Sequence, residues 1–100
     1  MYSTVIEIKK NITGEALNKL SQMAEKAFSN RAGSVKNSSS DPYKLVFKGG
    51  ENDYGCLDLG VAMLARSKGV LSSVDSWQWL DFDDPGENCD ILEAYAEPVK

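Results

Sequence analysis

The sequence contains no histidine, and this absence removes more functions than any other feature. Histidine is the commonest general base near neutral pH, the usual partner of a nucleophilic serine or cysteine, and the commonest ligand of transition metals. Catalysis here would need an Asp, Glu, Lys, Tyr or Cys side chain whose pKa is shifted by its surroundings. We therefore favour a protein that is not an enzyme, name no catalytic residue, and predict no cofactor.

Cysteine is scarce, since only Cys56 and Cys89 are present. They form no CxxC motif, which argues against a disulfide framework or a zinc knuckle. Cys56 falls in the first turn of a predicted helix, where the helix dipole favours a thiolate, but nothing supplies a base, so a structural thiol is favoured. Basic residues follow the first apolar run, the reverse of a secretion signal, so we expect a cytoplasmic protein with reduced thiols.

Long hydrophobic runs are absent as well, so no membrane segment is predicted. The 100 residues are 42% hydrophobic and 26% charged, which is typical of globular proteins. A chain of this length buries one core, and we predict a single domain over residues 1–100.

Apolar periodicity predicts the elements of the first half. Residues 2–9 alternate with a period of two and are rich in β-branched side chains, which indicates a strand. Thr13 can cap a helix over 14–29, because apolar residues then recur at spacings of three and four. Residues 43–48 alternate again and form a second strand, while a hairpin partner at 33–38 is left open.

The second half begins with a helix that is apolar over much of its circumference. It starts after Asn52 or Asp53, and Gly69 ends it. Residues 74–82 give a strand, residues 84–87 a turn and residues 91–97 a last strand, so the chain closes with a hairpin.

This order of elements resembles the split βαβ layout of ferredoxin-like domains. The resemblance implies an α+β two-layer sandwich, with an antiparallel sheet of four to five strands, two helices on one face and a C-terminal hairpin. It includes no diagnostic motif, and this layout carries many unrelated activities.

Acidic residues dominate the last third of the chain. Residues 69–99 contain eight acids and no Lys or Arg, whereas residues 1–68 contain ten basic and seven acidic residues. An acidic surface attracts a basic partner and speeds association, although a hairpin that merely stays soluble is the alternative. Nucleic acid is disfavoured as a partner, because the lysines are scattered and no basic stripe is present.

The acid-rich residues 81–90 also suggest a calcium or magnesium loop, but their spacing does not fit. An EF-hand loop that begins at Asp81 would put Gly86 correctly at its sixth position. Leu92 would then occupy the position of the bidentate Glu, so no metal site is predicted.

Two tryptophans lie within the acidic region. Trp77 and Trp79 are two residues apart and share one face of a regular strand, with Asp75 and Asp81 beside them. Exposed indoles commonly mark interfaces, although a covering element is the equal alternative. The predicted partner-binding residues are Asp75, Trp77, Trp79, Asp81, Asp83, Asp84 and Glu87.

These features support two hypotheses of different classes. The first is a small acidic protein-binding module, such as an inhibitor or immunity-type protein, that binds a basic partner through its C-terminal hairpin. The second is a ferredoxin-like dimer that binds a small ligand, or carries out simple chemistry, between sheet and helices. Its candidate residues are Tyr43, Tyr54, Trp77, Trp79 and Tyr95. We also predict a homodimer formed through a sheet face or the second helix, because the chain has a surplus of apolar surface.

Overall fold

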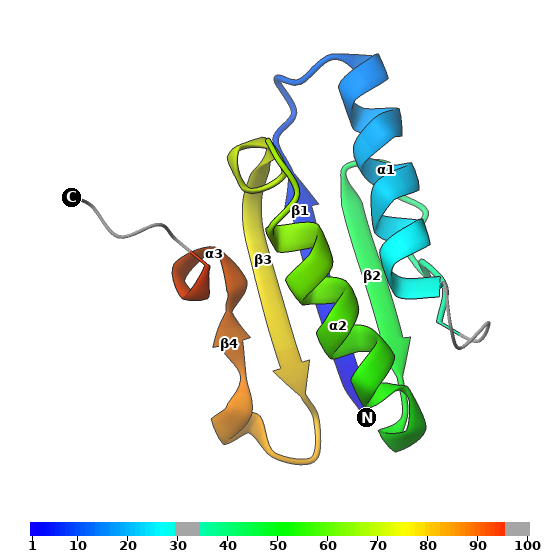
Figure 1. Cartoon of the computed structure of the whole chain (residues 1–100), viewed down its shortest axis with the longest axis vertical. Helices are drawn as coiled ribbons and strands as arrows, with labels where there is room; N and C mark the ends of the chain where they lie inside the picture. The colour runs from blue at the N-terminus through cyan, green and yellow to red at the C-terminus, as the bar shows by residue number, and fades with distance from the viewer. Residues whose placement is uncertain (30–34, 96–100) are drawn as a thin grey trace.

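The computed structural model describes residues 1–29 and 35–95 of the chain (Figure 1). Helices and strands alternate through most of it. The elements are β1 (Tyr2–Ile8), α1 (Gly14–Ser29), β2 (Lys44–Gly49), α2 (Tyr54–Ala65), β3 (Val74–Asp81), β4 (Cys89–Asp90) and α3 (Ile91–Ala94), with single 3-10 turns η1 (Glu51–Asp53), η2 (Leu71–Ser73) and η3 (Pro85–Glu87).

The four strands form one antiparallel sheet in the order β2-β1-β3-β4. Both β2 and β3 run antiparallel to β1, so they are parallel to each other, and the chain passes from one to the other through α2. The register between β1 and β3 shifts at Glu7 and Ile8. An antiparallel sheet with two main helices confirms the predicted α+β class.

The two main helices begin where local signals place them. The hydroxyl of Thr13 accepts a hydrogen bond from the Ala16 amide at 3.1 Å, which caps α1, and the observed bounds match the prediction. The Asp53 carboxylate accepts from the Gly50 amide at 2.9 Å just before α2. Gly69 adopts a φ of 83° soon after α2 ends, a conformation that costs glycine least.

Both helices lie on the same face of the sheet, and the core lies between them (Figure 1). Alternate strand residues point into it, as β-pleating requires. Phe28 of α1 stacks on Phe47 of β2 with ring centroids 4.6 Å apart. The buried apolar residues form one cluster: Ile6, Ile8, Leu20, Ala24, Phe28, Val35, Leu45, Phe47, Leu57, Val61, Leu64, Ala65, Val70, Val74, Trp77 and Ile91.

The predicted strand over 91–97 is wrong in its described part, because Ile91–Ala94 forms the short helix α3. The Asp90 carboxylate accepts hydrogen bonds from the amides of Leu92 and Glu93 at 3.0 and 3.4 Å. This N-cap turns the chain out of the sheet after two β4 residues, and it outweighs the β propensity of the apolar run. The closing hairpin is therefore short, and residues 96–97 lie outside the described residues.

The open question at residues 33–38 has a partial answer. Asn37 makes one isolated antiparallel bridge with Phe47, and the Ser38 amide donates to the Val46 carbonyl at 2.9 Å. Residues 33–34 are outside the described part of the chain. Among the described elements the order is therefore β-α-β-α-β-β-α, and not the β-α-β-β-α-β order of the expected layout.

Within residues 1–29 and 35–95, no helix has both the length and the apolar character needed to cross a bilayer.

Candidate functional site

Three aromatic rings meet on the helix-covered face of the sheet, at the end where β1 starts and β3 finishes. Tyr2 of β1 stacks on Trp79 of β3 with centroids 5.7 Å apart, and Tyr54 at the start of α2 meets both rings edge-on at 5.0 and 5.8 Å. Aromatic pairs at these distances stabilise one another. We call these three residues the aromatic cluster.

The aromatic cluster lies in a groove of about 470 Å³, bounded by α2 on one side and by β3, β4 and α3 on the other. Three acids line it, one each from α2, β3 and η3: Asp58, Asp81 and Glu87. No Lys or Arg is among the described residues that line it. We call this site the acidic groove, and its full lining is Tyr2, Tyr54, Asp58, Val61, Trp79, Asp81, Glu87, Cys89, Ile91, Ala94 and Tyr95.

Helix α2 contributes Tyr54, Asp58 and Val61 to the groove, at spacings of four and three. This spacing defines one stripe of a helix. Tyr54 and Asp58 of this stripe are exposed and Val61 is buried, so the Asp58 carboxylate lies at the solvent-exposed part of the groove.

Two titrating groups at this end of the sheet have pKa values that are raised, in part by nearby carboxylates. The α-amino group of Met1 has a raised pKa, chiefly because it donates a hydrogen bond to the Asp83 carboxylate. Tyr2 also has a raised pKa, first because burial disfavours its phenolate and then because Asp81 and Glu51 lie nearby. Each shift favours the less negative form of the group.

Local hydrogen bonds hold the loop from β3 to β4 in place. One carboxylate oxygen of Asp81 accepts from the amides of Asp83 and Asp84, both at 3.0 Å, and the Asn88 side chain accepts from the Asp81 amide at 2.8 Å. The Asp81 carboxylate thus has a structural role in this loop. No three Asp, Glu, Cys or His side chains in the described residues are placed to hold a metal ion.

The structure brings together only part of the predicted partner-binding set. Trp79, Asp81 and Glu87 line the acidic groove, while Asp83 and Asp84 are exposed on the loop beside it.

The other two predicted residues lie elsewhere. Trp77 is fully buried, and its indole N–H donates to the Thr4 hydroxyl at 2.6 Å, so it presents no surface to a partner. Asp75 is exposed near the opposite end of β3, about 20 Å from Asp81 at the usual rise per strand residue.

The candidates for a small-ligand site divide in the same way. Tyr54, Trp79 and Tyr95 line the acidic groove, Trp77 is in the core, and Tyr43 is not part of the groove lining. Sequence reasoning missed Tyr2 and Asp58. A signal existed for both, because Tyr2 shares the face of Thr4 and Ile6, and Asp58 lies one helical turn after Tyr54.

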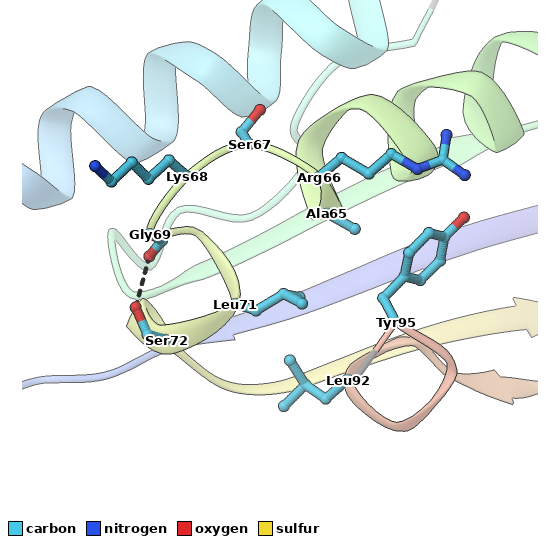
Figure 2. Close-up of a pocket in the computed structure, with 9 residues that line it drawn as sticks. All are labelled: Ala65, Arg66, Ser67, Lys68, Gly69, Leu71, Ser72, Leu92 and Tyr95. Atoms are coloured by element: carbon cyan, nitrogen blue, oxygen red, sulfur yellow. Dashed lines mark hydrogen bonds between the residues drawn. The ribbon is translucent and has the colours of Figure 1, made fainter. Parts of the chain in front are cut away.

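A second hollow, of about 750 Å³, lies beyond Tyr95, whose side chain lines both (Figure 2). Its charged residues are basic, namely Arg66 and Lys68, and we call it the basic hollow. The Arg66 guanidinium carbon lies 5.8 Å from the centroid of the Tyr95 ring, within cation–π range, while Lys68 extends the other way (Figure 2). Its serines are engaged locally: Ser67 donates to the Met63 carbonyl and Ser72 to the Gly69 carbonyl.

Comparison with protein-family models, with curated proteins and with solved structures gives no match for this chain. Function is therefore argued from the geometry and charge of the two hollows. The acidic groove combines convergent charge with partly buried rings, whereas the charged side chains of the basic hollow diverge (Figure 2).

Proposed function

We propose that this protein is a small binding module that recognises a basic partner protein through the acidic groove and the adjacent loop. One observation carries the proposal: carboxylates from three separate elements converge on a groove lined by three packed aromatic rings. Aromatic anchors supply most of the energy at many interfaces, and complementary charge supplies fast and specific association. No catalytic step is part of this proposal.

An inhibitor or immunity-type protein that blocks a basic nuclease would have these properties. Its carboxylates would occupy positions that nucleic-acid phosphates otherwise take, and the rings of the groove would provide apolar surface for side chains of the nuclease. The exposed Asp83 and Asp84 beside the groove extend the acidic surface and would steer the encounter.

The proposal is tested on basic proteins encoded by genes that neighbour this one. Calorimetric titration at low salt should give binding that weakens as salt is raised, because the association is electrostatic. The double variant Asp58→Asn with Glu87→Gln should bind at least about tenfold more weakly, the loss typical for charged hydrogen-bond partners. Asp75→Asn with Glu25→Gln, which removes two exposed acids outside the groove, is the charge-matched control and should bind normally.

An equal loss of affinity in both double variants would show that net charge alone attracts the partner. It would contradict the proposed role of the groove. A complete absence of binding by every basic neighbour would count against the module itself.

A second candidate function, binding of a small ligand, is favoured by the convergence of Tyr54, Trp79 and Tyr95 on one groove. The volume of the groove is within the range of about 300–1,000 Å³ that small-ligand pockets occupy. The two candidates differ in the size of what binds. A ligand retained from the source cell after gel filtration, and identified by mass spectrometry, would favour the second.

Self-association is a separate proposal, which concerns the outer side of α2. Leu59 and Met63 are 40% and 52% exposed there, and Met63 borders a hollow of about 220 Å³ shared with Met23 and Ala27 of α1. A twofold dimer through this surface would cover all four side chains. Sedimentation equilibrium should then give twice the monomer mass, and Met63→Lys should restore the monomer.

We also keep the ferredoxin-like layout as a hypothesis. Its support is that β2 and β3 are parallel, flank β1 and are joined through α2. A relative with this sheet order and a β-α-β-β-α-β chain order would strengthen it.

A further inference from the structure

We infer that the acidic groove receives a single arginine side chain of the partner, with its guanidinium on the aromatic cluster. The inference rests on the proposed function and adds the chemistry of the recognised group. Its basis is the joint placement of three aromatic rings and three carboxylates along one groove, which suits a cation better than a neutral or anionic group.

The rings provide a fixed surface. Trp79 is held on one side by Tyr2, whose plane is 27° from its own, and edge-on by Tyr54 at 83°. Tryptophan attracts cations over its face more strongly than tyrosine or phenylalanine. Because these rings are already packed against one another in the free protein, little side-chain entropy is lost on binding.

Three carboxylates line the same groove, and none of them forms a salt bridge within residues 1–29 and 35–95. Asp58 and Glu87 make no hydrogen bond or ion pair with other residues in the described part of the chain. The Asp81 carboxylate is oriented by two hydrogen bonds, which its Oδ1 atom accepts from the amides of Asp83 and Asp84. A cation in the groove would therefore be near carboxylates from three elements, of which Asp58 and Glu87 are exposed and Asp81 is half-buried.

The same geometry favours guanidinium over ammonium. A guanidinium is planar, stacks on aromatic faces, and donates to carboxylates in pairs, and it is less strongly hydrated than the ammonium group of lysine. The volume of about 470 Å³ also leaves room for the backbone on either side of the arginine. The basic hollow, although adjacent, is excluded for this ligand because Arg66 and Lys68 repel it.

The two tryptophans make a direct test possible by NMR. Trp77 is buried and Trp79 lines the groove, so their indole N–H signals serve as an internal reference and a reporter. The full chain is titrated with N-acetyl-arginine amide, with the lysine analogue, and with the citrulline analogue, a neutral isostere of arginine. We expect saturable shifts of the Trp79 signal with the arginine probe at millimolar concentration, about a tenfold weaker response to lysine, no response to citrulline, and an unmoved Trp77 signal.

Variants locate the site. Trp79→Leu and the double variant Asp58→Asn with Glu87→Gln should each weaken the arginine probe by about tenfold or more, followed at the remaining groove signals. Glu87 lies on the exposed turn η3, so the single variant Glu87→Gln should keep the fold and still remove one carboxylate of the groove. Arg66→Gln, in the basic hollow on the other side of Tyr95, is the control and should bind the probe at least as well as the original chain.

Equal shifts with citrulline or lysine, or undiminished binding by the groove variants, would overturn the inference. Probe binding without any basic protein partner would overturn the proposed function and keep the arginine site. Partner binding that is undiminished in Trp79→Leu would overturn the arginine site and keep the proposed function.

Discussion

The two ends of the helix-covered face of the sheet differ in how completely their side chains are buried. At one end Trp77, Ile8 and Val74 are sealed beneath the helices, and the polar N–H of Trp77 is satisfied by Thr4. At the other end Trp79 is only partly covered, by tyrosines, and carboxylates surround it. Trp77 and Trp79 are separated by one residue and point to the same face.

The periodicity of a strand therefore sets which face of the sheet a side chain joins, while the elements packed on that face set whether the side chain is buried. Over Trp77 the helices complete the layer. Over Trp79 the cover is incomplete, because β4 has two residues and the chain then turns into α3. The acids that line this gap resist burial, since an unpaired carboxylate is costly in an apolar interior, and so they help to keep the groove open.

Truncation of each tryptophan in turn should give the largest difference between the two ends. Trp77→Ala should lower the free energy of unfolding by about 3–5 kcal/mol, because it leaves a cavity and removes the hydrogen bond to Thr4. Trp79→Ala should cost about 1–2 kcal/mol, since it loses partial burial and two aromatic pairs. Urea denaturation followed by circular dichroism gives both values.

The control for this prediction is the slope of free energy against urea. If it is unchanged in both variants, the difference lies in native-state stability. Equal losses for the two residues would mean that the groove end is as tightly packed as the core, and would remove the basis for treating it as a binding site.

Part of this picture was predictable from the sequence. The period of 3.6 and the Thr13 cap were enough for α1, and alternation was enough for β1, β2 and β3, because these signals are local. The same alternation correctly put both tryptophans on one face. It could not separate them, since their burial depends on α2 and α3, which are distant in sequence.

The groove itself was harder to predict, because six elements meet there. Tyr2 comes from β1 and Asp58 from α2, and only the fold brings them beside Trp79. The error at α3 has a local cause instead. The apolar residues around Ile91 fit a strand and a helix equally well. Asp90 decides for the helix, because its carboxylate accepts hydrogen bonds from two amides of the first turn, and these contacts appear only in the structure.

A second test uses two glycines of α2, of which Gly55 lies in the first turn and Gly60 near the middle of the helix. A Cβ atom at Gly60 would lie 2.5 Å from the Phe28 ring, which is itself buried and stacked on Phe47. Gly60→Ala should therefore cost about 1–3 kcal/mol through overpacking. Gly55 is exposed near the groove end and a Cβ there meets nothing within 4 Å, so Gly55→Ala should stabilise by up to about 1 kcal/mol.

Thermal melts of the two glycine variants, side by side, measure this difference in sign. A stabilised Gly60→Ala protein would show that α1 and α2 are packed more loosely than the structure indicates. The sealed end would then be no different from the open one.

The weakest of these effects is a pH dependence of stability that arises from two groups at the open end. The α-amino group of Met1 and the phenol of Tyr2 both have pKa values raised in the folded protein, from 8.0 and 10.0. A group with a raised pKa binds its proton more tightly when folded, so its contribution is fully present below the unfolded pKa and is lost as pH rises through the folded one. Stability should therefore decline above pH 8.0 and again above pH 10.0.

Two variants separate these contributions. Asp83→Asn removes the main cause of the Met1 shift and should flatten the first decline, whereas Tyr2→Phe removes the titrating phenol and should flatten the second. Melting temperatures measured across this range, each compared with the original chain at the same pH, isolate the differences from titration elsewhere. Because Met1 and Tyr2 both sense the acids around the groove, Trp77→Phe at the sealed end should shift the whole curve downward without changing its slope. A changed slope in that variant, or an unchanged slope in both groove variants, would mean that the negative potential is not confined to the open end.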